Sequence, residues 1–204
     1  MKKGLSIGLT GGIACGKSEA GRILEREGVQ VRDADELAHE LIRRGGPLFD
    51  KVVGWFGEEI VGPDGEIDRQ ILGRRVFADA AERKALEALI HPEVIRVLRE
   101  WIAVETRQGK NAVAIAPLLF DVGWTDSWDA VVCVASTEKI VIERLKQRGL
   151  SEHDARARIT AQMPLETKIR KASYVIRNDG TLDSLEKRTR EVWRKIVREE
   201  RQSW

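Results

Sequence analysis

The feature that most constrains this chain is a glycine-rich stretch directly after its first apolar segment. Residues 11–18 read GGIACGKS and match the pattern G-x-x-x-x-G-K-[S/T] at every required position. The apolar run 5–10 before them predicts a strand, and residues 18–27 after them have the periodicity of a helix that stops at Gly28. This context separates the motif from an ordinary glycine turn and predicts a phosphate-binding loop.

Each residue type in the phosphate-binding loop has a chemical reason. Glycines let backbone N–H groups turn inward around phosphate oxygens. Lys17 is expected to reach the β- and γ-phosphates, and the Ser18 hydroxyl is expected to bind Mg²⁺. Cys15, beside Lys17 at a helix start, has a location that lowers a thiol pKa, but we expect it to contribute mainly its backbone N–H. The candidates for binding a nucleotide here are Gly11, Gly12, Ile13, Ala14, Cys15, Gly16, Lys17 and Ser18.

Four more short apolar runs predict further strands, at residues 29–31, 112–116, 130–134 and 174–176. Helical patterns separate them, which favours a parallel sheet covered by helices on both faces. A long charged helix is expected over about 182–201. Residues 82–108 are expected to be helical with one break at His91-Pro92, because proline can begin a helix at its first turn.

These patterns predict a single domain of 204 residues with two helical insertions. The nucleotide-binding core is expected to comprise residues 1–39, 110–136 and 172–204. Residues 40–109 are expected to form a helical substrate-binding insertion. Residues 137–171, rich in Arg and Lys, are expected to form a helical lid that excludes water.

Composition removes several classes of protein. There are 35 Lys and Arg residues against 33 Asp and Glu, so the basic surplus typical of a nucleic-acid-binding protein is absent. Two cysteines cannot build a disulfide framework, and the first apolar run is too short for a signal peptide or a membrane span. We therefore expect a cytoplasmic protein with no nucleic-acid or membrane partner, as a monomer or weak homo-oligomer.

Three classes of nucleotide-binding protein compete at this point. No D-x-x-G or N-K-x-D motif is present, which disfavours a switch GTPase, and Pro117 interrupts the nearest match to the acidic strand of a motor ATPase. A kinase needs an acid near the acceptor hydroxyl. Asp33 and Asp35 follow the second expected strand and, if extended, point the same way. One would act on the hydroxyl, and the other would hold a magnesium-bound water or cap the helix expected from Glu36.

The ordered set of motifs resembles the dephospho-coenzyme A kinase family over nearly the whole chain. The matching segments are GLTGGI at 8–13, DAD at 33–35 with LAH at 37–39, IHP at 90–92, PLLFD at 117–121, RI at 158–159 with Gln162, and VIRNDG at 175–180. The resemblance implies an α/β, P-loop NTPase-type three-layer core with a five-stranded parallel sheet, a helical substrate domain and a helical lid. It also implies transfer of the ATP γ-phosphoryl group to the 3′-hydroxyl of the dephospho-CoA ribose.

The resemblance assigns roles to particular residues of this chain. It makes Asp35 the catalytic acid, assisted by Lys17 and by Arg144, a lid arginine that meets the phosphates. It places Asn178 and Gly180 in the loop beside the ATP adenine. The residues it places in the acceptor region are Asp33, Asp35, His91, Pro117, Leu118, Phe120 and Asp121.

The chain also departs from the family's usual pattern. Ala14-Cys15 stand where Gly-Ser is common, Glu19 where Ser or Thr is common, and Asp121 where Glu is frequent. We expect the backbone cradle to survive these changes. Two other functions stay open, another P-loop kinase of nucleosides or nucleotides and a non-catalytic ATP-binding regulatory protein.

Overall fold

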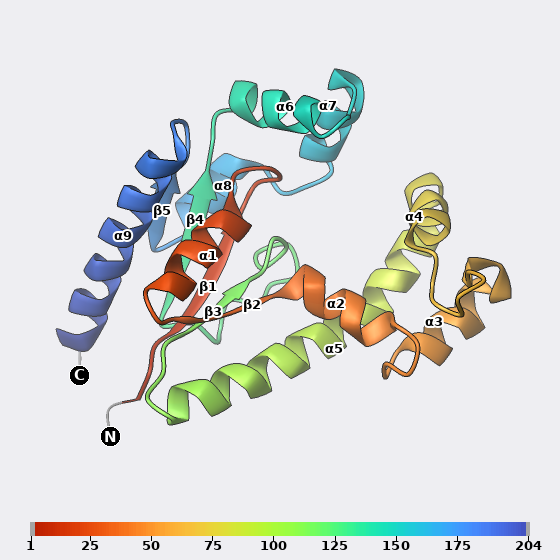
Figure 1. The fold of residues 1–204 in the computed structure, drawn as a ribbon, viewed down its shortest axis with the longest axis horizontal. Helices are drawn as coiled ribbons and strands as arrows, with labels where there is room; N and C mark the ends of the chain where they lie inside the picture. The colour runs from red at the N-terminus through yellow and green to blue at the C-terminus, as the bar shows by residue number, and fades with distance from the viewer. Residues whose placement is uncertain (1–2, 203–204) are drawn as a thin grey trace. The chain divides into compact units, whose positions relative to one another are not determined.

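The computed structural model describes residues 3–202, which form two compact units (Figure 1). The helical unit comprises residues 34–100, and the sheet unit comprises the described segments on either side, 3–33 and 101–202. The helical unit corresponds to the expected insertion at 40–109, with both boundaries shifted toward the N-terminus.

The sheet unit is built on five parallel strands. They are β1 (Ser6–Gly11), β2 (Gln30–Asp33), β3 (Ala112–Ile115), β4 (Ala130–Ala135) and β5 (Tyr174–Arg177), in the order β2-β3-β1-β4-β5. Every residue of β1, β3 and β4 is buried, as expected for a parallel sheet covered on both faces. The expected α/β fold with a five-stranded parallel sheet is confirmed.

Helices α1 (Lys17–Arg26), α6 (Glu138–Gln147) and α9 (Leu182–Gln202) contribute to the core on one face of this sheet (Figure 1). Val132 and Val134 of β4 point into that core together with Ile23 of α1 and Leu145 of α6. Successive side chains of a strand alternate between faces, so Cys133 points to the other side.

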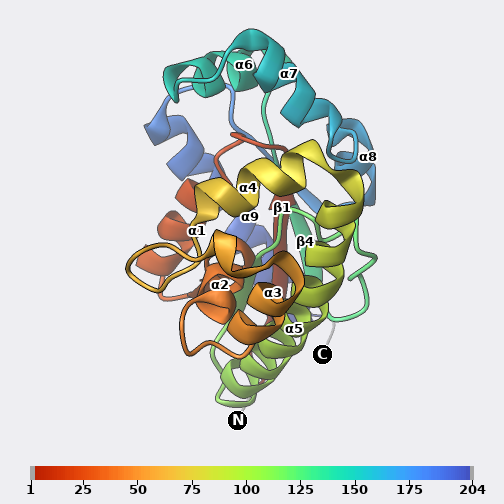
Figure 2. The same cartoon turned by 90° about the vertical axis from the view of Figure 1, so that its right-hand side faces the viewer.

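Helix α8 (Leu165–Lys171) covers that other face, where it contacts β1 and β4. Thr10 of β1 alternates with the core residue Leu9 and donates a hydrogen bond to the Pro117 carbonyl, which also accepts one from Lys168 of α8. The sheet therefore has helices on both faces. Helix α7 (Glu152–Thr160) packs on α6, and Figure 2 shows the pair side by side.

The helical unit is formed by α2 (Ala34–Ile42), α3 (Phe49–Phe56), the short 3₁₀ helix η1 (Glu58–Ile60), α4 (Arg69–Ala78) and most of α5 (Ala80–Arg107), which continues into the sheet unit. Arg75 of α4 donates hydrogen bonds to the Phe56 carbonyl, Glu59 and Glu82, and so ties four of these segments together. Within residues 3–202, no helix is both long enough and apolar enough to cross a membrane.

The break expected at His91-Pro92 is wrong, because α5 runs through Pro92 as one helix of 28 residues. The reason is burial. Ile90, Val94, Leu98 and Ile102 follow one another at intervals of four and are all buried. Inside a helix proline removes one hydrogen bond and its ring crowds the carbonyl of the preceding turn, at a cost of about 3 kcal/mol, although its fixed φ suits a helix. The apolar stripe continues past the proline and keeps the helix intact.

Candidate active site

The phosphate-binding loop lies between β1 and α1, as its motif indicates. Gly11 and Gly16 have φ values of 147° and 98°, which glycine adopts readily. A Cβ atom on Gly11 would lie 2.1 Å from the Val134 carbonyl oxygen, so the loop also approaches β4 too closely for any side chain there. Lys17 and the exposed Ser18 are the first two residues of α1, where the helix dipole favours anions.

Lys17 folds back over the loop. Its Nζ atom donates to the Gly12 carbonyl at 2.8 Å and to the Gly11 carbonyl at 3.4 Å. Glu19, which brings a negative charge to the first turn of α1, pairs with Arg22 at 2.9 Å. The two hydrogen bonds of Lys17 hold its ammonium group against the backbone of the phosphate-binding loop.

The Cys15 side chain is fully buried. Burial raises the pKa of its thiol, and the nearby positive charge of Lys17 only partly offsets that effect. The location beside Lys17 therefore does not produce a net lowering of the pKa. The thiol stays neutral, and the Cys15 backbone donates to the Gly12 carbonyl at 3.4 Å and accepts from Asn178 at 2.9 Å.

Three side chains from other segments surround the Ala14 and Cys15 carbonyls of the loop, on the side that we call its outer side. Asn178, which follows β5 and is 5% exposed, donates from Nδ2 to the Cys15 carbonyl at 2.9 Å. Arg144 of α6 donates to the Ala14 carbonyl, to Ser136 Oγ and to the Asn178 carbonyl, each at 3.1 Å. Ser136 donates to the same Asn178 carbonyl at 2.7 Å. We call Ser136, Arg144 and Asn178 the outer clamp.

Residues 117–121 follow β3 at the same edge of the sheet. The Asp121 carboxylate forms an ion pair with Lys168 Nζ at 3.0 Å and accepts a hydrogen bond from the Met163 N–H at 3.0 Å. Lys168 is completely buried and also donates to the Pro117 carbonyl at 2.7 Å. Phe120 is buried with Lys171 above its ring, and Leu118 is half-buried. Asp121 is therefore bound to protein groups on both of its oxygens.

The two acids of the DAD motif lie in different secondary structure. Asp33 is the last residue of β2 and pairs in register with Ile115 of β3, which places it at the carboxyl edge of the sheet. Asp35 is the second residue of α2 and is exposed. Helix α2 begins at Ala34 and not at Glu36. The extended arrangement that would point both acids the same way is therefore wrong.

The remaining predicted residues occupy separate places. His91 is half-buried in the interior of α5, within the helical unit. Gly180 is exposed in the turn between β5 and α9. Within the sheet unit, the phosphate-binding loop, Asp33, residues 117–121, Arg144 and Asn178 are brought together around the carboxyl ends of the strands, where open α/β sheets bind ligands.

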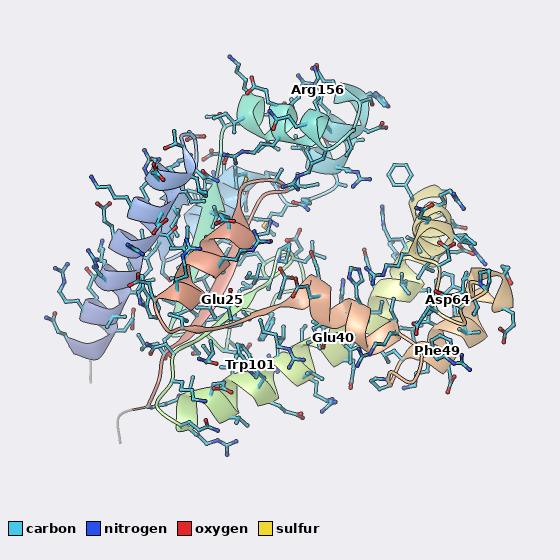
Figure 3. All side chains as sticks on the ribbon, in the orientation of Figure 1. Glu25, Glu40, Phe49, Asp64, Trp101 and Arg156 are labelled. Atoms are coloured by element: carbon cyan, nitrogen blue, oxygen red, sulfur yellow. The ribbon has the colours of Figure 1, made fainter. Side chains whose placement is uncertain are left out.

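A cavity of about 380 Å³ lies between the phosphate-binding loop and helices α6 to α8. It is lined by apolar side chains such as Ile13, Val141, Ile159 and Leu165, with the β4–α6 connection on one side. Arg156 of α7, labelled in Figure 3, pairs with Glu138 of α6 at 2.6 Å and with Glu152 at 3.0 Å. The pair with Glu138 joins the two helices that border the cavity, whereas the pair with Glu152 lies within α7.

Sequence reasoning missed Ser136 and Lys168. Ser136 directly follows β4, so its place at the carboxyl edge was a usable signal. Lys168 stands in a run of basic residues that looks uniformly solvated, and composition alone could not separate it from its exposed neighbours.

Comparison with known proteins shows to which family this chain belongs. The family model described as dephospho-CoA kinase matches residues 5–184. The chain belongs to the dephospho-CoA kinase family. The predicted resemblance is thereby confirmed. The chain is 46% identical over 192 residues to a dephospho-CoA kinase of Geobacter sulfurreducens, covering 93% of this chain and 97% of that one. It is 42% identical to one of Bacillus cereus, covering 86% and 89%.

Solved structures agree. A Thermus thermophilus protein superposes with a TM-score of 0.77 at 34% identity, covering 95% of this chain and 98% of the other. A dephospho-CoA kinase from Campylobacter jejuni gives 0.65 at 26% identity, covering 94% and 96%. A shikimate kinase from Acinetobacter baumannii, at 14% identity, gives 0.56 over 96% and 94% and supports the fold alone.

Proposed function

We propose that this chain transfers the γ-phosphoryl group of ATP to the 3′-hydroxyl of dephospho-CoA, giving CoA and ADP. The observation that carries the proposal is a complete phosphate-binding loop at the carboxyl edge of a parallel sheet, in a chain whose family membership extends over residues 5–184. Transfer of this kind depends on positioning and on charge neutralisation more than on covalent chemistry. The substrates are then ATP and dephospho-CoA.

The phosphate-binding loop and the start of α1 would bind the phosphates of ATP. Backbone N–H groups of the loop would bind phosphate oxygens, and the Lys17 ammonium would leave the Gly12 carbonyl to neutralise charge on the transferred group. Within residues 3–202 no group of three or more His, Cys, Asp or Glu side chains could hold a metal ion. A Mg²⁺ ion held by the Ser18 hydroxyl and the nucleotide phosphates fits this arrangement, and when bound it would supply further neutralisation.

The acceptor end is assigned residue by residue, following the family resemblance. Asp35, exposed at the start of α2, would orient the acceptor hydroxyl and accept its proton. We assign acceptor binding to Asp33, His91 and the 117–121 segment. Within that segment Asp121 would act by holding Pro117, Leu118 and Phe120 in place, because Lys168 and Met163 occupy its carboxylate. The helical unit would hold the acceptor, helices α6 and α7 would serve as the lid, and Gly180 would border the adenine.

The role of Asp35 is tested by Asp35→Asn. The amide cannot accept the proton, so we expect kcat to fall by about 10²- to 10⁴-fold. The dissociation constant for Mg–ATP should stay within about twofold, since the change spares the phosphate-binding loop. Glu36→Gln is the matched control, an exposed acid next along the same helix, and it should leave kcat unchanged. Near-normal turnover of Asp35→Asn would contradict the assignment.

The identity of the acceptor is tested by assaying a panel of candidate substrates. Dephospho-CoA is compared with nucleosides and nucleoside monophosphates at equal concentration, with ADP release as the readout. We expect kcat/KM for dephospho-CoA to exceed all others by orders of magnitude. A preference for a nucleoside or a nucleotide would assign the chain to another P-loop kinase activity.

A further inference from the structure

We propose that Arg144 and Asn178 are positioning residues, which hold the phosphate-binding loop in its binding conformation from the outer side. The proposal rests on the proposed function, because it concerns how ATP phosphates are bound. It differs from the roles that the family resemblance implies, in which Arg144 meets the phosphates and Asn178 lies beside the adenine.

Asn178 controls the peptide between Cys15 and Gly16. Its Nδ2 atom donates to the Cys15 carbonyl at 2.9 Å. In a trans peptide the C=O and the following N–H point in opposite directions, so this hydrogen bond directs the Gly16 N–H to the opposite side of the loop. The fit is close, since a Cβ atom on Gly16 would lie 2.3 Å from Asn178 Nδ2.

Asn178 is itself held rigidly. Its backbone N–H donates to the Ala135 carbonyl at 2.7 Å, and its carbonyl accepts from both Ser136 and Arg144. The side chain is thus anchored to the end of β4 before it reaches the loop. A buried residue whose backbone is bonded at both its N–H and its carbonyl has a fixed position, which suits a positioning role.

Arg144 controls the peptide before it, between Ala14 and Cys15. Among residues 3–202, Ala14 is the one non-glycine residue with positive φ, at 53°. The left-handed region is unfavourable for a residue with a Cβ atom. The charge-assisted hydrogen bond from Arg144 to the Ala14 carbonyl offsets that strain. Arg144 therefore matters more here than it would with glycine at position 14.

The guanidinium hydrogen bonds of Arg144 all end on protein oxygens, namely the Ala14 carbonyl, Ser136 Oγ and the Asn178 carbonyl. They join α6, the end of β4, the turn after β5 and the phosphate-binding loop. Arg144 thereby connects a helix of the expected lid to the backbone that binds phosphate.

The first experiment separates loop positioning from adenine recognition. Binding of Mg–ATP and of Mg–tripolyphosphate, which has no base, is measured by calorimetry on Asn178→Ala and Arg144→Met. We expect each variant to weaken both probes by at least tenfold and by similar factors, as loss of a buried hydrogen bond to the loop requires. A loss confined to ATP would overturn the proposal in favour of adenine contact.

The second experiment separates loop positioning from direct phosphate contact by Arg144. Ala14→Gly removes the steric strain, so the double variant Ala14→Gly/Arg144→Met should recover at least threefold of the lost tripolyphosphate affinity. A guanidinium that touches phosphate cannot be replaced by glycine at position 14, so absence of recovery would overturn the proposal for Arg144.

The controls keep the outcome decisive. Arg198→Met removes the same charge from an exposed position far along α9 and should change neither affinity. Thermal unfolding verifies that every variant is folded. If Arg144→Met does not fold, Arg144→Lys replaces it. Lysine can reach only part of the outer clamp, so the affinity of this variant for both probes should lie between that of the wild type and a tenfold loss. A wild-type protein that fails to bind Mg–ATP would refute the proposed function. Normal wild-type binding with unaffected variants would refute only the positioning roles.

Discussion

Ala14 illustrates how one side chain can cost stability at a site that must keep its shape. Its φ of 53° costs a residue with a Cβ atom about 1–2 kcal/mol, whereas glycine loses roughly 0.5–1 kcal/mol through its freer unfolded chain. We therefore predict that Ala14→Gly stabilises the protein by about 1 kcal/mol. The measurement is the urea midpoint at unchanged m-value.

The matched control for this change is Ala157→Gly, at an exposed position inside α7. There glycine should destabilise by about 1 kcal/mol, because the backbone is already helical. A midpoint for Ala14→Gly that equals or falls below that of the wild type would contradict the strain argument.

Lys168 is the second residue whose environment makes a sharp prediction. Its ammonium is completely buried between the Pro117 carbonyl and Asp121, and Asp121 keeps 22% of its side chain exposed. Removing one partner of a buried pair costs about 3–5 kcal/mol, and partial exposure of the other partner favours the lower end. We predict that Lys168→Met lowers the free energy of unfolding by about 3 kcal/mol, measured by denaturant titration.

Lys171→Met is the control for the Lys168 variant. It removes the same charge from an exposed position of the same helix, above the Phe120 ring. Its cost should stay within about 1 kcal/mol. Equal costs for the two variants would show that the buried ion pair does not hold α8 to the 117–121 segment.

At the scale of residues, the sequence was informative where chemistry demands a fixed spacing. The GGIACGKS motif predicts the phosphate-binding loop because the pattern requires two glycines and a Lys-Ser pair at fixed spacing. Ser136 and Lys168 carry no such pattern. Their roles arise from tertiary contacts between segments far apart in the chain, such as Lys168 with Asp121.

At the scale of elements, α5 shows why local rules failed. Pro92 is a strong breaker signal, but Ile90, Val94, Leu98 and Ile102 are buried in one stripe and keep the helix continuous. The strands were predicted well because β3 and β4 are apolar throughout and β1 has Ile7 and Leu9 among residues that are all buried. Helix α8 belongs to the segment 137–171 that is expected to form a lid; the structure places it against β1 and β4, and its basic composition does not reveal the buried Lys168.

The contact of β5 with α9 makes a pH-dependent prediction. Burial, together with a 2.8 Å hydrogen bond to Glu199, raises the pKa of Tyr174 to about 12 from an ordinary value near 10. Between pH 10 and 12 the folded state keeps the Tyr174 proton that the unfolded state loses. The contribution of Tyr174 to the free energy of unfolding is therefore complete below pH 10 and is lost as the pH rises toward 12. The stability advantage of the wild type over Tyr174→Phe should shrink across that interval.

Tyr174 is the single tyrosine of the chain, so the ultraviolet absorbance of tyrosinate reports this residue alone. We expect its titration midpoint in the folded protein to lie near pH 12 and to return toward 10 in denaturant. A midpoint near 10 in the folded protein would contradict the combined effect of burial and the hydrogen bond to Glu199.

At the scale of the whole molecule, the parallel sheet explains how distant motifs meet. The order β2-β3-β1-β4-β5 puts Asp33 at the carboxyl end of β2, and it puts the 117–121 segment, the phosphate-binding loop, Ser136 and Asn178 just after the carboxyl ends of the other four strands. Apolar runs with helices between them were sufficient to predict this fold class. The exact extent of the helical unit, residues 34–100, depends on packing and could not be read from periodicity.

The most direct test of the account is a coupled assay of ADP release from Mg–ATP, with and without dephospho-CoA, on the wild type and on Lys17→Ala. We predict ADP release that requires dephospho-CoA in equal amount and yields CoA, and that falls by at least 10²-fold in Lys17→Ala, since one well-placed charge stabilises the transition state by several kcal/mol. ADP release that ignores dephospho-CoA, or that survives Lys17→Ala unchanged, would contradict the account.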